Sequence, residues 1–126
     1  MTVTKSLLIV TAVFEAATGI ALLALPAVPV GLLLGASLGT AGGLAVARVT
    51  GAAMLSLGLA CWLASNDGRT RPGRGVITAM LVYNTAVVAV LAHASLGLGL
   101  AGIGLWPAAG IHTVLAVWCV AGLRSA

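Results

Sequence analysis

The chain has 126 residues, of which 61% are hydrophobic and only 6% are charged, and its mean hydropathy is +1.20. Soluble domains carry about 25% charged residues, so this composition excludes an ordinary water-facing surface and indicates that lipid is the solvent. The net charge of +4 does not indicate nucleic-acid binding, because the basic residues form no stripe with interleaved aromatic side chains. The length is that of one small domain, so we expect residues 1–126 to form a single unit.

Four segments are long and apolar enough to cross a bilayer, which requires roughly 20 mostly apolar residues. In chain order they are residues 6–25, 44–65, 75–96 and 105–123. Pro26 ends the first span, because proline cannot continue the hydrogen-bond ladder of a helix. The polar string SNDGRTRPGR at residues 65–74 is typical of a turn between the second and third spans. We therefore predict an all-α fold, an integral membrane bundle of four transmembrane helices.

One charged residue stands inside the first span. Glu15 lies in the stretch VTAVFEAATGIALL, which is otherwise apolar or small. An ionised group at the bilayer centre costs about 2.5–3.5 kcal/mol on insertion scales, so such residues usually pair and face the interior of a bundle. The apolar run around Glu15 is longer than the core of a usual signal peptide, so we predict a retained helix.

The connector between the first two spans, residues 26–43, is long and uncharged. Its glycines recur every four residues, at Gly31, Gly35, Gly39 and Gly43. In a helix this spacing places all four glycines on one face, where another helix can approach closely. In the alternative interpretation, the segment is a flexible loop in the outer headgroup region. The sequence leaves both interpretations open.

Small and sulfur-containing residues within the spans indicate packing positions. Ala47 and Gly51 are four residues apart in the second span, and we expect them to mark tight packing within the bundle rather than a dimer face. Cys61 and Cys119 fall at similar depths near the inner ends of their spans. A reducing cytoplasmic side argues against a disulfide there, and their spacing gives no metal motif, so we predict that both cysteines pack.

The distribution of basic residues predicts the orientation. Apart from one arginine inside a span, the basic residues are Lys5, Arg69, Arg71, Arg74 and Arg124. The connectors at residues 26–43 and 97–104 contain neither lysine nor arginine. By the positive-inside rule, we expect both termini and the 66–74 loop to lie in the cytoplasm, with the protein in the inner membrane of a bacterium.

Polar residues inside the spans are predicted to form one buried layer in the outer half of the bundle. Glu15 is about 15 Å and Arg48 about 7 Å from the outer ends of their spans at 1.5 Å per residue, so a long arginine can reach the carboxylate. The guanidinium can then hold both carboxylate oxygens in an ion pair. The full set of candidate residues, for ligand binding or for structure, is Glu15, Arg48, Tyr83, Asn84, His93 and His112.

Each member of this layer also has a purely structural interpretation. The Glu15–Arg48 pair can fix helix register without doing chemistry, and Asn84 can serve as a hydrogen-bonding link between helices. The histidines can be neutral and bonded to backbone, or interfacial. A haem held by His93 and His112 suits bundle geometry, but an offset of about 5 Å in depth disfavours it. The sequence requires no cofactor, haem or quinone, and it predicts no metal site.

No catalytic set can be assembled from the sequence. The only aspartate, Asp67, lies in the predicted cytoplasmic loop, which leaves no Ser-His-Asp arrangement. Residues 97–102, GLGLAG, match a dinucleotide fingerprint letter by letter, but no strand precedes them and no acidic residue follows. The sequence therefore favours a protein without an enzymatic activity of its own.

The front half of the chain carries a characteristic spacing of glycine, proline and charged residues. Its members are Glu15, Gly19, Leu25, Pro26, Leu34, Gly35 and then Arg48, Gly51, Leu55, Leu57 and Gly58 in RVTGAAMLSLGLACWLA. This pattern, over roughly residues 5–65, resembles the DoxX-like group of small four-helix bacterial membrane proteins. The resemblance implies a compact four-helix bundle. Some members of that group are similar to membrane subunits of redox complexes, but no motif here would carry that activity over.

Three hypotheses for the function follow. In the first, the protein is a non-catalytic auxiliary or structural subunit whose partners are the lipid bilayer and either other membrane subunits or further copies of itself. In the second, the polar layer binds a lipid-like or quinone-like ligand and has a redox or proton role. In the third, the protein transports a small solute and uses Glu15 to do so.

Overall fold

The structure is a computed structural model that describes residues 2–125. Over that range the chain forms five α-helices and no strand. They are α1 (Val3–Ala24), α2 (Ala27–Leu34), α3 (Ala41–Leu63), α4 (Arg71–Leu96) and α5 (Leu105–Arg124). All except α2 are long and apolar enough to cross a membrane. The predicted all-α membrane bundle with four transmembrane helices is confirmed.

The long helices lie close to the predicted spans, and threonine caps account for the earlier starts of α3 and α4. α3 begins at Ala41, where the Thr40 hydroxyl accepts a hydrogen bond from a first-turn amide at 3.0 Å. α4 begins at Arg71, where the Thr70 hydroxyl accepts from a first-turn amide at 3.2 Å. A capping side chain satisfies amides that have no partner within the helix, so the helix can begin several residues before its apolar run.

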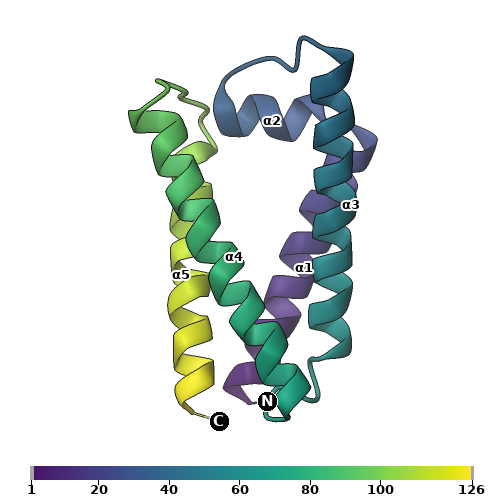
Figure 1. Ribbon diagram of the computed structural model, residues 1–126, viewed down its shortest axis with the longest axis vertical. Coiled ribbons are helices and arrows are strands. Elements are labelled where there is room, and N and C mark those ends of the chain that lie inside the picture. The colour runs from purple at the N-terminus through teal and green to yellow at the C-terminus, as the bar shows by residue number, and fades with distance from the viewer. Residues whose placement is uncertain (1, 126) are drawn as a thin grey trace.

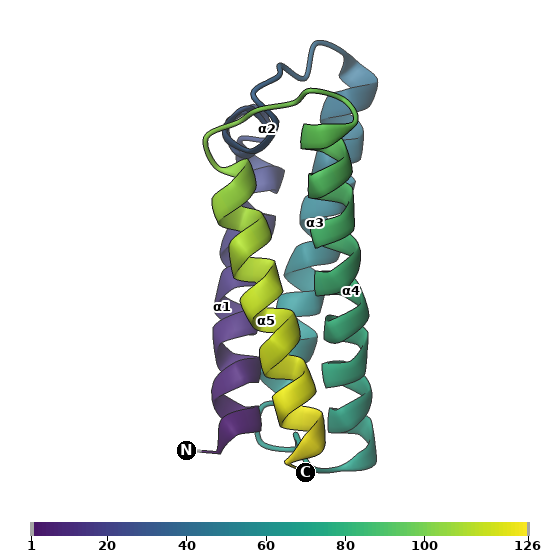
Figure 2. The ribbon, with the colours of Figure 1, turned by 90° about the vertical axis from the view of Figure 1, so that its left-hand side faces the viewer.

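The helices are arranged as two pairs (Figure 1). α1 packs mainly against α3, and α4 packs mainly against α5. The pairs approach each other at the end that holds both termini and the loop between α3 and α4, and they separate toward the opposite end. The short helix α2 lies across that opposite end and contacts both α1 and α5, as the rotated view in Figure 2 also shows.

Glycines bring the backbones of α1 and α3 into direct contact. A Cβ atom added to Gly19 would come within 2.7 Å of the Gly51 carbonyl oxygen, and a Cβ added to Gly51 would come equally close to the Gly19 oxygen. Nearer the termini, a Cβ added to Gly58 would lie 2.9 Å from the carbonyl oxygen of Ala12. Small residues at a crossing allow membrane helices to pack this closely. The tight intramolecular packing predicted at Gly51 is confirmed.

The connector at residues 26–43 is half helix and half loop, so each of the two interpretations describes one part of it. α2 ends where Gly35 takes a left-handed backbone conformation, with φ +65°, which favours glycine. The Leu32 carbonyl in the last turn of α2 accepts a hydrogen bond from the Gly104 amide at 2.8 Å, which fixes α2 to the start of α5. A Cβ added to Gly31 meets nothing within 4 Å, so this glycine does not support helix packing.

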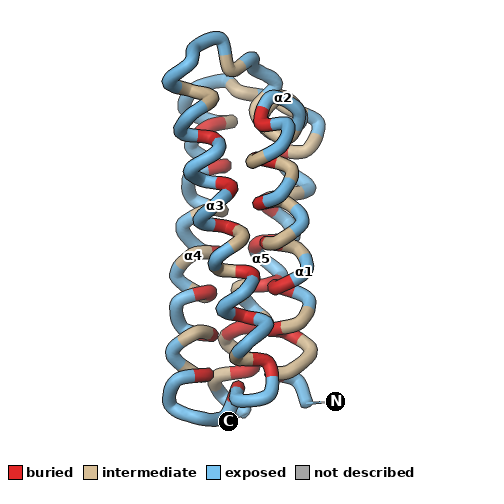
Figure 3. The backbone as a smooth tube through the Cα atoms, turned by 90° about the vertical axis from the view of Figure 1, so that its right-hand side faces the viewer, coloured by how far each residue is buried: buried red, intermediate tan, exposed pale blue. Residues whose placement is uncertain are grey.

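The largest buried cluster lies toward the end that holds the termini. It comprises Leu7, Leu8, Ala12, Cys61, Ile77, Met80, Leu115 and Cys119. Both cysteines are free and buried within it, consistent with their predicted packing role. The outward faces of the helices are apolar and exposed, with Val49 at 70% and Val114 at 63% (Figure 3). An apolar exterior of this extent suits contact with lipid.

Candidate functional site

Glu15 is buried where α1 meets the α4/α5 pair. Its side chain is 0% exposed, and Oε2 accepts a hydrogen bond from the Tyr83 hydroxyl at 3.1 Å. The other carboxyl oxygen, Oε1, has no hydrogen-bond partner within the described chain, and neither has the hydroxyl of Thr11. Residues four apart lie on one face of a helix, so the two unpartnered oxygens belong to the same face of α1. Glu15 thus has a neutral partner and one free oxygen.

The predicted ion pair between Glu15 and Arg48 is wrong. Arg48 is exposed on α3, and its Nε donates a hydrogen bond to the Leu23 carbonyl at 3.3 Å. That carbonyl lies in the last turn of α1, where carbonyls lack helix partners and the helix end carries partial negative charge. The glycine contacts between α1 and α3 bring this helix end beside Arg48. The guanidinium is therefore satisfied close to the helix ends, where a long side chain can also reach the bilayer surface.

A second polar pair joins α4 to α5. His112 Nδ1 lies 2.7 Å from Asn84 Oδ1, and Asn84 Nδ2 donates to the Met80 carbonyl at 2.7 Å. A carbonyl can only accept, so the amide nitrogen of Asn84 faces Met80 and its oxygen faces the histidine. That oxygen also can only accept, so Nδ1 of His112 carries the proton. In a neutral ring, Nε2 is then an acceptor.

Two aromatic rings flank His112. The ring centroids of Phe14 and Tyr83 lie 5.7 Å and 5.8 Å from that of the histidine, and both pairs are edge-to-face with an interplanar angle of 77°. These contacts and hydrogen bonds bring together four of the candidate residues, from α1, α4 and α5: Glu15, Tyr83, Asn84 and His112. The layer was expected to draw on every span, but within residues 2–125 no side chain of α3 joins these hydrogen bonds.

His93 lies apart from this group. It is exposed in the last turn of α4, nine residues beyond Asn84, which corresponds to about 13 Å along the helix axis. Asn84 is the residue that contacts His112. The two histidines of the haem hypothesis are therefore at different depths, and the structure does not place them in one site.

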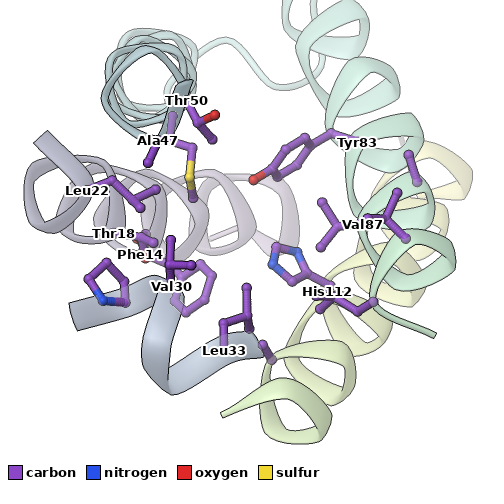
Figure 4. Close-up of a pocket in the computed structure, with 16 residues that line it drawn as sticks. Phe14, Thr18, Leu22, Val30, Leu33, Ala47, Thr50, Tyr83, Val87 and His112 are labelled. Carbon is purple, nitrogen blue, oxygen red and sulfur yellow. The ribbon is translucent and has the colours of Figure 1, made fainter. Parts of the chain in front are cut away.

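A cavity of about 460 Å³ lies between the two helix pairs, under α2. Its wall is mostly apolar, and its polar side chains are Thr18, Thr50, Tyr83 and His112. Figure 4 shows the Tyr83 hydroxyl and the His112 ring directed into this space from α4 and α5, opposite side chains of α1, α2 and α3. The volume is within the usual range for small-molecule sites, about 300–1,000 Å³.

The cavity opens sideways, toward the lipid. Thr50 on α3 and Ala86 and Val90 on α4 line it and are also exposed on the surface. These two helices belong to different pairs, which separate toward the α2 end (Figure 1). The exposed wall residues of α3 and α4 therefore mark the side of the cavity that faces the outside of the bundle.

The apolar wall of the cavity was not predicted from the sequence. Phe14, Thr18 and Leu22 recur every four residues and share one face of α1, and all three line the cavity. This periodicity was available in the sequence. However, an apolar helix face looks the same whether it packs against a neighbour or borders a cavity, because the difference depends on how far apart the helices lie.

No protein-family model, curated protein or solved structure matches the chain. The resemblance of residues 5–65 to the DoxX-like group stays a prediction.

Proposed function

We propose that this protein binds a small amphipathic molecule dissolved in the membrane, of lipid-like or quinone-like chemistry, in the cavity between the helix pairs. The observation that supports this function is a mostly apolar cavity of about 460 Å³ between the helix pairs, into which a few polar side chains, above all Tyr83 and His112, are directed. An apolar wall suits hydrocarbon, and a few convergent polar groups suit a head group. Apolar cavities that stay dry bind apolar molecules readily.

Glu15 lies outside the cavity wall and contacts the site through Tyr83. It accepts the hydrogen bond of Tyr83 and is not itself part of the wall. A transporter that exchanges protons at Glu15 would need access to the carboxyl group, which is 0% exposed. The burial of Glu15 therefore favours a binding role for the site over a transport role.

The proposal places the cavity in the outer half of a bacterial inner membrane, with both termini in the cytoplasm. Five of the six basic residues belong to the first turn of α1, the loop between α3 and α4, the start of α4 or the last turn of α5, all at the end that holds both termini: Lys5, Arg69, Arg71, Arg74 and Arg124. The positive-inside rule assigns that end to the cytoplasm. A ligand-binding protein without a catalytic set would work with a partner, so we further propose an auxiliary role in a membrane complex or a self-associating assembly.

Photolabelling tests the binding function. The protein in lipid nanodiscs is mixed with a long-chain alcohol that carries a diazirine, irradiated, and mapped by mass spectrometry. We expect saturable labelling of wall residues such as Phe14 and Val87. An excess of the parent alcohol should suppress this labelling by competing with the probe. Labelling confined to outward-facing residues such as Val114 would contradict the proposal, because any membrane protein collects probe on its lipid surface.

A pair of matched variants separates the cavity from the surface. Ala86→Phe places a large ring at the lateral opening, on an exposed position that can accept it without disturbing the core. Ala89→Phe makes the same change on an exposed position of α4 outside the wall. We expect saturable labelling to disappear in Ala86→Phe and to persist in Ala89→Phe. Equal labelling of the two variants would argue against the cavity as the binding site.

A further inference from the structure

The hydroxyl groups of the two threonines in the cavity wall donate their protons to backbone carbonyls. The Thr18 hydroxyl donates to the Phe14 carbonyl at 2.9 Å, and the Thr50 hydroxyl donates to the Val46 carbonyl at 2.9 Å. Each hydroxyl has one proton and two lone pairs. Both threonines therefore present only acceptors to the cavity.

Tyr83 and His112 likewise donate their protons to side chains outside the cavity wall. The Tyr83 hydroxyl donates to Glu15 Oε2 at 3.1 Å, which leaves lone pairs on the phenol oxygen. The Nδ1 proton of His112 is held by Asn84 Oδ1, so the remaining ring nitrogen, Nε2, is an acceptor in the neutral ring. The proton of each polar side chain in the wall thus points away from the cavity.

The backbone of the wall supplies no donor either. The amides of wall residues in α1, α3, α4 and α5 lie within helices and bond carbonyls one turn earlier. In α2, Pro29 has no amide proton, the Val30 amide bonds the Pro26 carbonyl at 3.3 Å, and the Leu33 amide lies within the helix, where it bonds one turn earlier. The described residues that line the cavity therefore offer hydrogen-bond acceptors to it and no donor.

From this arrangement, and on the basis of the proposed function, we infer that the cavity selects a ligand whose polar group donates a hydrogen bond. The ligand class is a hydroxyl-bearing amphiphile, such as a long-chain alcohol or the hydroquinone form of a quinone-like molecule. Its hydroxyl proton would bond His112 Nε2 or the Tyr83 oxygen. An ether, an ester or an oxidised quinone would instead place its lone pairs against lone pairs, and an anionic head group would do so more strongly.

Asn84 is the positioning residue for this selectivity. It does not belong to the cavity wall, and it acts through His112 by holding the proton on Nδ1. The Met80 carbonyl fixes the orientation of the Asn84 amide, so this chain of bonds runs from the backbone of α4 to the ligand-facing nitrogen. Without Asn84, the proton of the ring could lie on either nitrogen, and Nε2 could donate.

A matched pair of probes tests the inference on the wild-type protein. The photoreactive long-chain alcohol is compared with its methyl ether, which differs only in the loss of the donor. We expect the alcohol to bind about fivefold or more tightly, the ratio that a net hydrogen bond near 1 kcal/mol supplies. If both probes label the cavity with equal affinity, or the ether is preferred, the inference is overturned while the binding function stands. If neither labels the cavity saturably, the binding function itself fails.

The variant Asn84→Leu tests the positioning role. We expect it to bind both probes with a ratio of affinities near one, because the histidine proton is no longer fixed. Thr85→Val, which removes a polar group from the neighbouring exposed position, should keep the wild-type ratio. An unchanged ratio in Asn84→Leu would contradict the role of Asn84. If that variant does not fold, ¹⁵N chemical shifts of His112 in the wild-type protein decide the same point, since a proton on Nε2 would contradict the assignment.

Discussion

The two charged residues inside the spans have neutral or backbone partners rather than each other. Glu15 takes a hydrogen bond from a tyrosine, and Arg48 donates to the end of a helix. An ion pair within the bundle would require both charges to lose their water, and its attraction often fails to exceed that desolvation cost. A long arginine near a helix end avoids this cost, because its charged group can stay near the headgroups.

Replacement of Arg48 tests this account at the residue scale. If Arg48 only caps α1, Arg48→Gln should lower the free energy of unfolding by at most about 1 kcal/mol, the usual size of a charge at a helix end. Loss of one partner of a buried ion pair would cost about 3–5 kcal/mol. Unfolding in mixed detergent and SDS measures the difference. In the double variant with Glu15→Gln, the two changes in the free energy of unfolding should add. A strong coupling between them would contradict this account and support the ion pair.

The elements of the fold differ in how closely they pack. α1 and α3 touch through glycines, whereas α3 and α4 separate toward α2 and leave the cavity between them. The long helices therefore provide both a closely packed pair and a cavity. α2 lies across the wide end, where the Leu32 carbonyl accepts a hydrogen bond from the Gly104 amide and so joins α2 to the start of α5.

Two alanine substitutions test the close contact at the scale of elements. Gly51→Ala adds a Cβ that would lie 2.7 Å from the Gly19 carbonyl oxygen, so the helices must move apart. We expect a loss of about 1–3 kcal/mol of stability, as for other overpacked sites. Gly110→Ala in α5 meets nothing within 4 Å and should be neutral or stabilising by up to about 1 kcal/mol. Unfolding in detergent measures both, and equal behaviour would contradict the glycine contact.

The two ends of the molecule differ in how the helix pairs are arranged. Both termini and the loop between α3 and α4 are at one end, where the pairs meet, and α2 covers the other, where they diverge. Apolar side chains cover the outside of the four long helices, so the bilayer is the solvent for most of the surface. The cavity is at the α2 end, and the orientation of the protein decides which leaflet it faces.

Cysteine labelling tests the proposed orientation. Asn66→Cys and Ser37→Cys each place a thiol on an exposed loop, one at either end of the molecule. Cys61 and Cys119 are buried and should give little background. With a membrane-impermeant maleimide, we expect Ser37→Cys to react in spheroplasts and Asn66→Cys to react only in inverted vesicles. The reverse pattern, or labelling of both variants from one side, would overturn the orientation.

Composition and hydrophobic length were sufficient to predict the class of the fold and the four long helices, because lipid requires apolar side chains and internally bonded backbone. Pro26 and the polar string at residues 65–74 gave the approximate helix ends. The sequence also marked Glu15, Tyr83, Asn84 and His112 as unusual, since polar groups are costly at such depth.

Only the tertiary structure decided which of these residues meet. The depth of a residue follows from counting along a helix, but its partners depend on the rotation and pairing of the helices, which glycine contacts between α1 and α3 determine here. Those contacts place Arg48 beside the Leu23 carbonyl, and Glu15 accepts a hydrogen bond from Tyr83 instead. The cavity is likewise a property of the distance between helix pairs, and no local pattern in the sequence encodes that distance.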